Sequence, residues 1–185
     1  MKFLKASNLY SLNKSTYVKL RWIAYIGQFI TILFVQFLLN FKFNYFICIL
    51  IIFFSVLTNL YLHFKIKGNQ LNNATSTIYL SFDIIQLSIL LFLTGGITNP
   101  FVILIIVPAV FSSQYLNIYS SIILVLLIVV ILSILSFYHF ELPHPGELHF
   151  HAPEYYIFAI PASIIIGLLF LVYFGVKFGE ETRIR

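Results

Sequence analysis

The run SIILVLLIVVILSILSFY, residues 121–138, decides the fold class because its eighteen residues include no charged side chain. A hydrocarbon core of roughly 30 Å takes about 20 residues of helix, so this run predicts a membrane-spanning helix. Five more apolar segments lie at about 20–39, 44–62, 77–93, 101–116 and 155–174. We therefore predict an all-α, polytopic bundle of six transmembrane helices over residues 20–174. Pro108 and Pro161 are expected to kink the fourth and sixth helices.

Composition agrees with a membrane protein. The chain has 185 residues, of which 61% are hydrophobic and 9% are charged, whereas a soluble domain carries about 25% charged residues. The six segments occupy most of the chain, so we expect no catalytic domain within it. The net charge of +5 does not indicate nucleic-acid binding, because the basic residues are not massed on one soluble face. The single cysteine, Cys48, lies in an apolar run and predicts neither a disulfide nor a metal site.

Basic residues predict the orientation. All but one of them lie before the first segment, after the second or after the sixth, namely Lys2, Lys5, Lys14, Lys19, Arg21, Lys65, Lys67, Lys177, Arg183 and Arg185. Only Lys42 falls on the other side, and cytoplasmic loops are the ones enriched in Lys and Arg. We therefore expect a multi-pass membrane protein with both termini cytoplasmic. Residues 1–19 and 175–185 would form its cytoplasmic ends, and the loop 94–100 would lie outside.

The sequence GGITNPF, residues 95–101, connects the third and fourth segments. Gly95 and Gly96 let the chain turn, Asn99 is a favoured N-cap, and Pro100 suits a first helical position. Taken alone, these residues describe a well-formed turn between helices. Glycine also leaves backbone N–H groups open to a ligand. With the Asn99 amide as a further donor and Phe101 as a flat wall, the corner could hold a quinone head group, a planar ring with two carbonyl acceptors.

Asp83 is an ionisable residue inside the third segment. Intramembrane carboxylates cost about 2.5–3.5 kcal/mol on insertion scales and normally find a partner within the bundle. Gln86 shares its helix face, Gln28 lies at a similar depth in the first segment, and Arg21 could snorkel toward them. We predict an intramembrane polar cluster of these four residues. It could bond two helices together, act as a protonation switch, or line the path of a small proton or ion transporter or channel subunit.

The outer connection 139–154 is rich in histidine and glutamate. These residues are His139, Glu141, His144, Glu147, His149, His151 and Glu154. Their spacing matches no compact zinc or copper framework, so we interpret the stretch as a solvated loop and expect no metal.

Two stretches resemble a known family. FDIIQLS at 82–88 and LFLTGGITNPF at 91–101 are similar to the sensor region of RegB/PrrB/ActS-type redox-responsive histidine kinases, and LRWIA at 20–24 resembles its first span. The resemblance implies six spans, cytoplasmic termini and ubiquinone as the sensed ligand, bound through Gly95, Gly96, Asn99, Pro100 and Phe101. It also implies exchange with the quinone pool, a two-component system with a cognate response regulator, and a homodimer.

The same resemblance implies parts that these 185 residues do not supply. Such proteins carry a phosphorylated histidine, a redox-active cysteine and an ATP-binding domain after the membrane region. We expect that kinase part to lie outside this chain, with 175–185 starting the linker to it. His63 and Cys48 are not expected to take those roles. A structural membrane scaffold, in which GGITNPF is only a turn, remains the second alternative beside the transporter.

Overall fold

The computed structural model describes residues 11–141 and 155–184. The long helices are α2 (Lys14–Leu33), α3 (Tyr45–Lys65), α4 (Asn73–Leu93), α6 (Ile118–Phe137) and α7 (Tyr156–Ile184). The shorter elements are the two-residue strands β1 (Leu12–Asn13) and β2 (Gln70–Leu71), the π-helical turn η1 (Phe34–Leu38), the 3-10 helices η2 (Gly96–Thr98) and η3 (Pro100–Ile106), and α5 (Val107–Tyr115). The predicted all-α class is thus confirmed, apart from one small strand pair.

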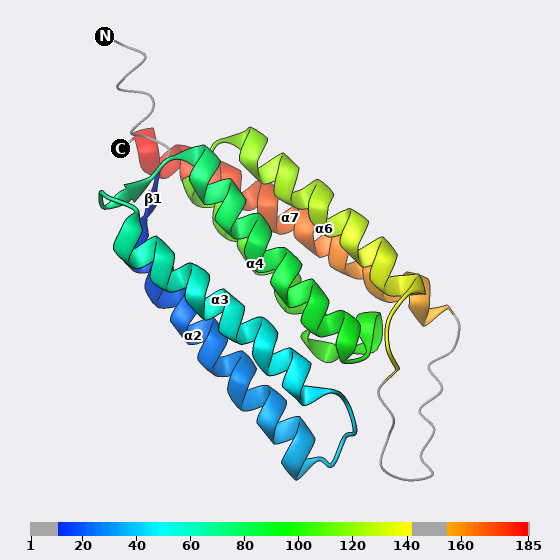
Figure 1. Ribbon diagram of the computed structural model, residues 1–185. Helices are drawn as coiled ribbons and strands as arrows, with labels where there is room; N and C mark the ends of the chain where they lie inside the picture. The colour runs from blue at the N-terminus through cyan, green and yellow to red at the C-terminus, as the bar shows by residue number, and fades with distance from the viewer. Residues whose placement is uncertain (1–10, 142–154, 185) are drawn as a thin grey trace.

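Five helices are long and apolar enough to cross a membrane, and Pro100–Tyr115 is a sixth, shorter apolar helix. The number of spans therefore remains a prediction. Figure 1 shows consecutive helices running back and forth, so that the start of α2 and the end of α7 lie at the same end of the bundle. Three helices, α2, α4 and α7, extend beyond the apolar segments that predicted them. Polar residues next to those segments continue the same helices.

The segment Pro100–Tyr115 changes helix type along its length. It begins as the 3-10 helix η3 and continues as α5. A 3-10 helix rises about 2.0 Å per residue against about 1.5 Å for an α-helix, so the segment is about 27 Å long. Pro108 lies in the first turn of α5, where its missing N–H is tolerated. The predicted kink inside a continuous helix is therefore wrong for Pro108, because the α-helix starts there.

Asparagine side chains cap the starts of α2, α3, α4, η3 and α6. The capping bonds run from backbone N–H groups to the side chains of Asn13, Asn44, Asn72, Asn99 and Asn117. Each bond satisfies one of the orphan donors of a first helical turn. Strand β1 pairs antiparallel with β2, Leu12 opposite Leu71, and this pairing ties the start of α2 to the α3–α4 connection.

The interior and the outer surface of the bundle are both apolar. Ile84, Ile105, Leu124 and Leu168 belong to one fully buried core built mainly from α4, η3, α5, α6 and α7. A smaller cluster around Cys48 joins α2, α3 and α4. Large hydrophobic side chains such as Phe53, Leu126 and Phe170 are more than half exposed on the outside. A helical bundle with this outer surface is suited to lipid rather than to water.

Helix α7 packs closely on α5 at Gly175. A Cβ atom at this position would lie 1.9 Å from Ser113 Oγ and 3.1 Å from Ser113 Cβ. Small residues permit such close approach of membrane helices. We expect Gly175→Ala to lower the free energy of unfolding by about 1–3 kcal/mol in detergent.

Ser113→Ala provides the test of that cause, because it removes the nearer atom. It should recover part of the loss in the Gly175→Ala background, whereas Gly167→Ala, with no atom within 4 Å of the new Cβ, should leave stability nearly unchanged. Equal losses at Gly175 and Gly167 would contradict the close packing of α5 and α7.

Candidate functional site

A buried ion pair joins α2 to α4. Arg21 Nη2 lies 2.8 Å from Asp83 Oδ1, and Arg21 Nε donates to the same oxygen at 3.0 Å. The two side chains are 3% and 17% exposed. Arg21 therefore reaches into the predicted polar cluster and not toward water. It stays inside because Asp83 offers it a paired charge, which a lipid-facing position would not.

Hydroxyl groups form hydrogen bonds with both members of this pair. Tyr17 donates to Asp83 Oδ2, and Tyr25 donates to Asp83 Oδ1 at 3.4 Å. Arg21 Nη2 also donates to Thr58 Oγ1 at 2.9 Å, so the pair connects α2, α3 and α4. The two tyrosines were not among the residues predicted for the polar cluster. Their spacing could have revealed them, since Tyr17, Arg21 and Tyr25 recur every four residues on one face of α2.

A second polar contact links the same two helices farther along. Gln86 Nε2 donates to Gln28 Oε1 at 3.0 Å. The structure therefore arranges the four residues of the predicted cluster as two pairs, one ionic and one between amides. Both pairs have the geometry of interhelical bonds, which favours the structural interpretation of Asp83 over a path for ions.

The GGITNPF corner between α4 and η3 is held by hydrogen bonds of Asn99. Its Nδ2 donates to the backbone oxygen and to Oγ1 of Thr94, each at 2.9 Å. Its Oδ1 accepts from Phe101 N at 2.9 Å. Gly95 and Gly96 have φ angles of 105° and 56°, which other residues rarely adopt. The amide that was expected to be a free donor is therefore engaged within the turn.

The glycines of the corner are covered rather than open. A Cβ atom on Gly96 would lie 2.3 Å from His139 Cγ, and Phe140 N donates to Phe92 O at 2.8 Å. The expectation that Gly95 and Gly96 present open N–H groups is wrong, because the chain after α6 folds over them. Thr98, Pro100 and Phe101 are the exposed residues of the corner, and Phe101 is 43% exposed.

Only part of the histidine-rich connection can be placed. His139 Nδ1 lies 2.9 Å from Leu135 O. Five residues of the predicted loop, His144, Glu147, His149, His151 and Glu154, lie outside the described residues. Within residues 11–141 and 155–184, no group of three or more His, Cys, Asp or Glu side chains could hold a metal ion.

These features define a class of protein. Apolar helices of spanning length, an apolar outer surface and an ion pair sealed between helices are the properties of a multi-pass helical membrane protein.

A curated relative specifies the class further. The chain is 31% identical over 169 residues to the sensor histidine kinase RegB of Cereibacter sphaeroides, a match that covers 91% of the chain and 37% of RegB. The predicted resemblance to the membrane sensor region of RegB-type kinases is thereby confirmed, and the chain is a multi-pass protein of the bacterial inner membrane. It spans just over a third of the length of this relative. No protein-family model and no solved structure matches it.

Proposed function

We propose that this chain is the membrane sensor of a two-component histidine kinase and that it responds to the redox state of ubiquinone. The observation that carries the sensor role is the similarity to a sensor histidine kinase along 91% of the chain. The quinone pool would supply the ligand, and a cognate response regulator and a homodimeric arrangement would follow from the same role. ATP-dependent phosphotransfer would belong to a kinase part that these residues do not include.

The exposed side of the GGITNPF corner is the proposed quinone site. Phe101 and Pro100 offer a flat apolar surface to a ring, and Asn99 lies between them and Thr94 with its amide engaged in the turn. A quinone carbonyl would compete with Thr94 for the Asn99 N–H groups. Gly95 and Gly96 would act by shaping the turn and not as direct donors, since both are buried.

Competition between the quinone carbonyl and Thr94 for Asn99 would couple ligand binding to the position of α7. Asn99 caps η3, which runs directly into α5. Helix α5 packs on α7 at the close contact between Ser113 and Gly175, and α7 continues to Ile184. Loosening the cap would shift η3 and α5 against α7, and α7 would pass the shift to the kinase linker.

The redox dependence follows from hydrogen-bond chemistry. Oxidised quinone oxygens accept hydrogen bonds, whereas reduced quinone also donates them. A donor at Asn99 would favour the oxidised form, and a preference of about 1–3 kcal/mol is enough to bias two conformations of a bundle. Equal affinity for both forms in one titration would exclude this mechanism and leave quinone binding intact.

Binding of ubiquinone to the purified protein in nanodiscs tests the site. Phe101→Ala should weaken saturable binding about tenfold, because it removes the ring surface. Ile103→Ala is the matched control, since Ile103 is 48% exposed on the same helix η3 but belongs to no part of the corner motif. Both variants must unfold at the wild-type temperature. Equal affinities of the wild type and Phe101→Ala would place the quinone outside the corner.

The orientation of the bundle has its own test. Cysteines introduced at Thr98 and Asn73, at opposite ends of the α4 region, should react with a membrane-impermeant thiol reagent from opposite faces. The native Cys48 is fully buried and should contribute little labelling. We expect Thr98→Cys to react from outside and Asn73→Cys from the cytoplasm, as the distribution of basic residues predicts. Labelling of both from one face would overturn the predicted topology.

A further inference from the structure

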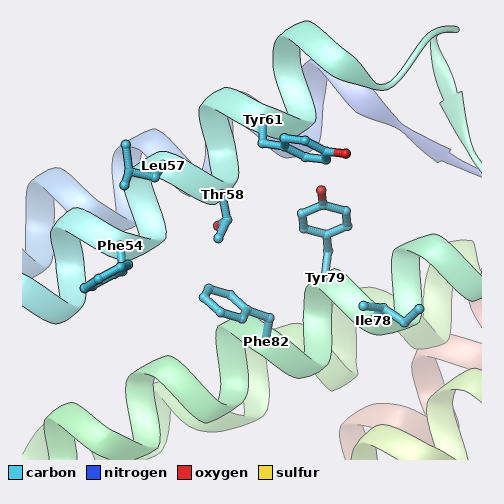
Figure 2. A pocket seen from close by; sticks show the side chains of 7 residues that line it. All are labelled: Phe54, Leu57, Thr58, Tyr61, Ile78, Tyr79 and Phe82. Atoms are coloured by element: carbon cyan, nitrogen blue, oxygen red, sulfur yellow. The ribbon is translucent and has the colours of Figure 1, made fainter.

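A groove of about 330 Å³ lies between α3 and α4, near the ion pair and distinct from the outer corner. Its lining includes Phe54 and Thr58 from α3, and Tyr79 and Phe82 from α4. Figure 2 shows Phe82 facing Thr58 across the groove, while the Tyr61 and Tyr79 hydroxyls approach each other at one end. The groove therefore has an aromatic body and a hydroxyl-bearing end, and its volume is at the lower limit of the usual range for small-molecule sites.

The hydroxyl-bearing end has unused hydrogen-bonding capacity. Within the described part of the chain, neither the Tyr61 nor the Tyr79 hydroxyl forms a hydrogen bond that would occupy it, whereas Tyr17 and Tyr25 are both bonded to Asp83. Tyrosine hydroxyls at the end of an apolar groove can donate to an oxygen that enters with an apolar body.

The wall of the groove is in contact with the buried cation. The Arg21 guanidinium carbon lies 5.3 Å from the centre of the Tyr79 ring and 6.0 Å from that of Phe82, and Arg21 Nη2 donates to Thr58. Among the described residues, Arg21 Nη1 is buried without a hydrogen-bond partner. Arg21 is 3% exposed and does not itself line the groove, so its contact with the groove runs through the rings of Tyr79 and Phe82 and through Thr58.

We propose that this groove is a second ligand site, which takes a flat, uncharged, lipid-soluble ring bearing a hydrogen-bond-acceptor oxygen such as a ring carbonyl. The ring lies between the aromatic side chains, and its oxygen accepts from the tyrosine hydroxyls. The proposal does not depend on quinone binding at the outer corner, because the two sites share no residue.

Charge and shape favour this occupant over others. Asp83 already neutralises Arg21, so an anionic head group would bring an uncompensated charge into an apolar groove. A simple acyl chain would fill the volume but would leave both tyrosine hydroxyls without an acceptor. A ligand in the groove would also affect the packing of α2 against α4, since Thr58 and Tyr79 contact Arg21, whose ion pair joins these two helices.

Photolabelling tests the groove with a defined probe. The full 185-residue chain in nanodiscs is illuminated with 4-decylbenzophenone, an uncharged ring ketone, and mass spectrometry locates the labelled peptides. We expect labelling to concentrate on residues 54–61 and 78–82. An excess of decyl-1,4-benzoquinone should reduce it at least fivefold, whereas decylbenzene, which has the ring and chain but no oxygen, should not.

Two sets of variants separate the groove from the corner and from general lipid exposure. Leu57→Trp narrows the groove and should abolish the competed labelling. Leu126→Trp, a lipid-facing control on α6, should not change it. Tyr61→Phe combined with Tyr79→Phe should weaken competition about tenfold without changing the unfolding temperature.

Four results would overturn the proposal. Labelling spread evenly over lipid-facing helices would show partitioning of the probe into lipid, and equal competition by decylbenzene would show a slot for hydrocarbon chains. Groove labelling that is unchanged in Leu57→Trp would show that the probe does not occupy the space between α3 and α4. Loss of labelling in Phe101→Ala alone would also count against the groove and in favour of the corner, so that the two proposals fail by different observations.

Discussion

Replacing Arg21 with alanine is expected to lower the free energy of unfolding by about 3–5 kcal/mol, the usual cost of leaving one member of a buried ion pair without its partner. Arg21 is 3% exposed and contacts Asp83 through both Nε and Nη2. Its loss would leave the Asp83 carboxylate with only tyrosine hydroxyls inside the bundle, and it would also release Thr58 on α3. Equilibrium unfolding in mild detergent, monitored by helical circular dichroism, measures the effect.

An exposed ion pair provides the matched control for Arg21→Ala. Lys177 and Glu180 lie 3.5 Å apart with 59% and 49% exposure, and pairs of this kind contribute little. Lys177→Ala should therefore leave the unfolding midpoint nearly unchanged. The double variant Arg21→Met with Asp83→Leu should recover most of the lost stability, because it removes both buried charges. A loss for Arg21→Ala no larger than that for Lys177→Ala would contradict the buried interhelical pair.

The second large effect is expected at the GGITNPF corner. Gly96→Ala should lower stability by about 2–4 kcal/mol, because overpacking and left-handed backbone strain add at this position. The new Cβ would lie 2.3 Å from His139 Cγ and 2.4 Å from His139 Cβ, and the φ angle is +56°. Because the contacting atoms are at the base of the His139 side chain, a change of rotamer cannot remove the clash. Unfolding in detergent again provides the measurement.

Gly68 separates backbone strain from packing in this experiment. It has a φ angle of +97°, yet a Cβ there would meet no atom within 4 Å. Gly68→Ala should therefore show only the strain, about 1 kcal/mol. Adding His139→Ala should recover part of the stability that Gly96→Ala loses. It should recover none of the stability that Gly68→Ala loses. Equal losses at the two glycines would mean that the segment after α6 does not cover the corner.

Much of the fold follows from local properties of the chain. Helices appear where apolar residues run for about the thickness of a hydrocarbon core, and they begin at asparagines because an amide oxygen can satisfy an orphan N–H. The turn at 95–101 is local in the same sense, since the hydrogen bonds of Asn99 go to residues within five positions along the chain, among them Thr94 and Phe101. Asp83 could also be recognised from the sequence as a residue that needs a partner, because its charge lies inside an apolar segment.

The sequence by itself therefore determined that the protein is an α-helical membrane protein, where its helices lie and which residues mark its resemblance to RegB-type sensors. Only the tertiary structure decided which groups meet across helices. It brought Tyr17, Tyr25 and Thr58 to the Arg21–Asp83 pair, laid His139 over Gly96, and formed the groove between α3 and α4. The physical reason is that helix formation depends on neighbours within one or two turns, whereas these contacts depend on how helices distant in sequence rotate and approach one another.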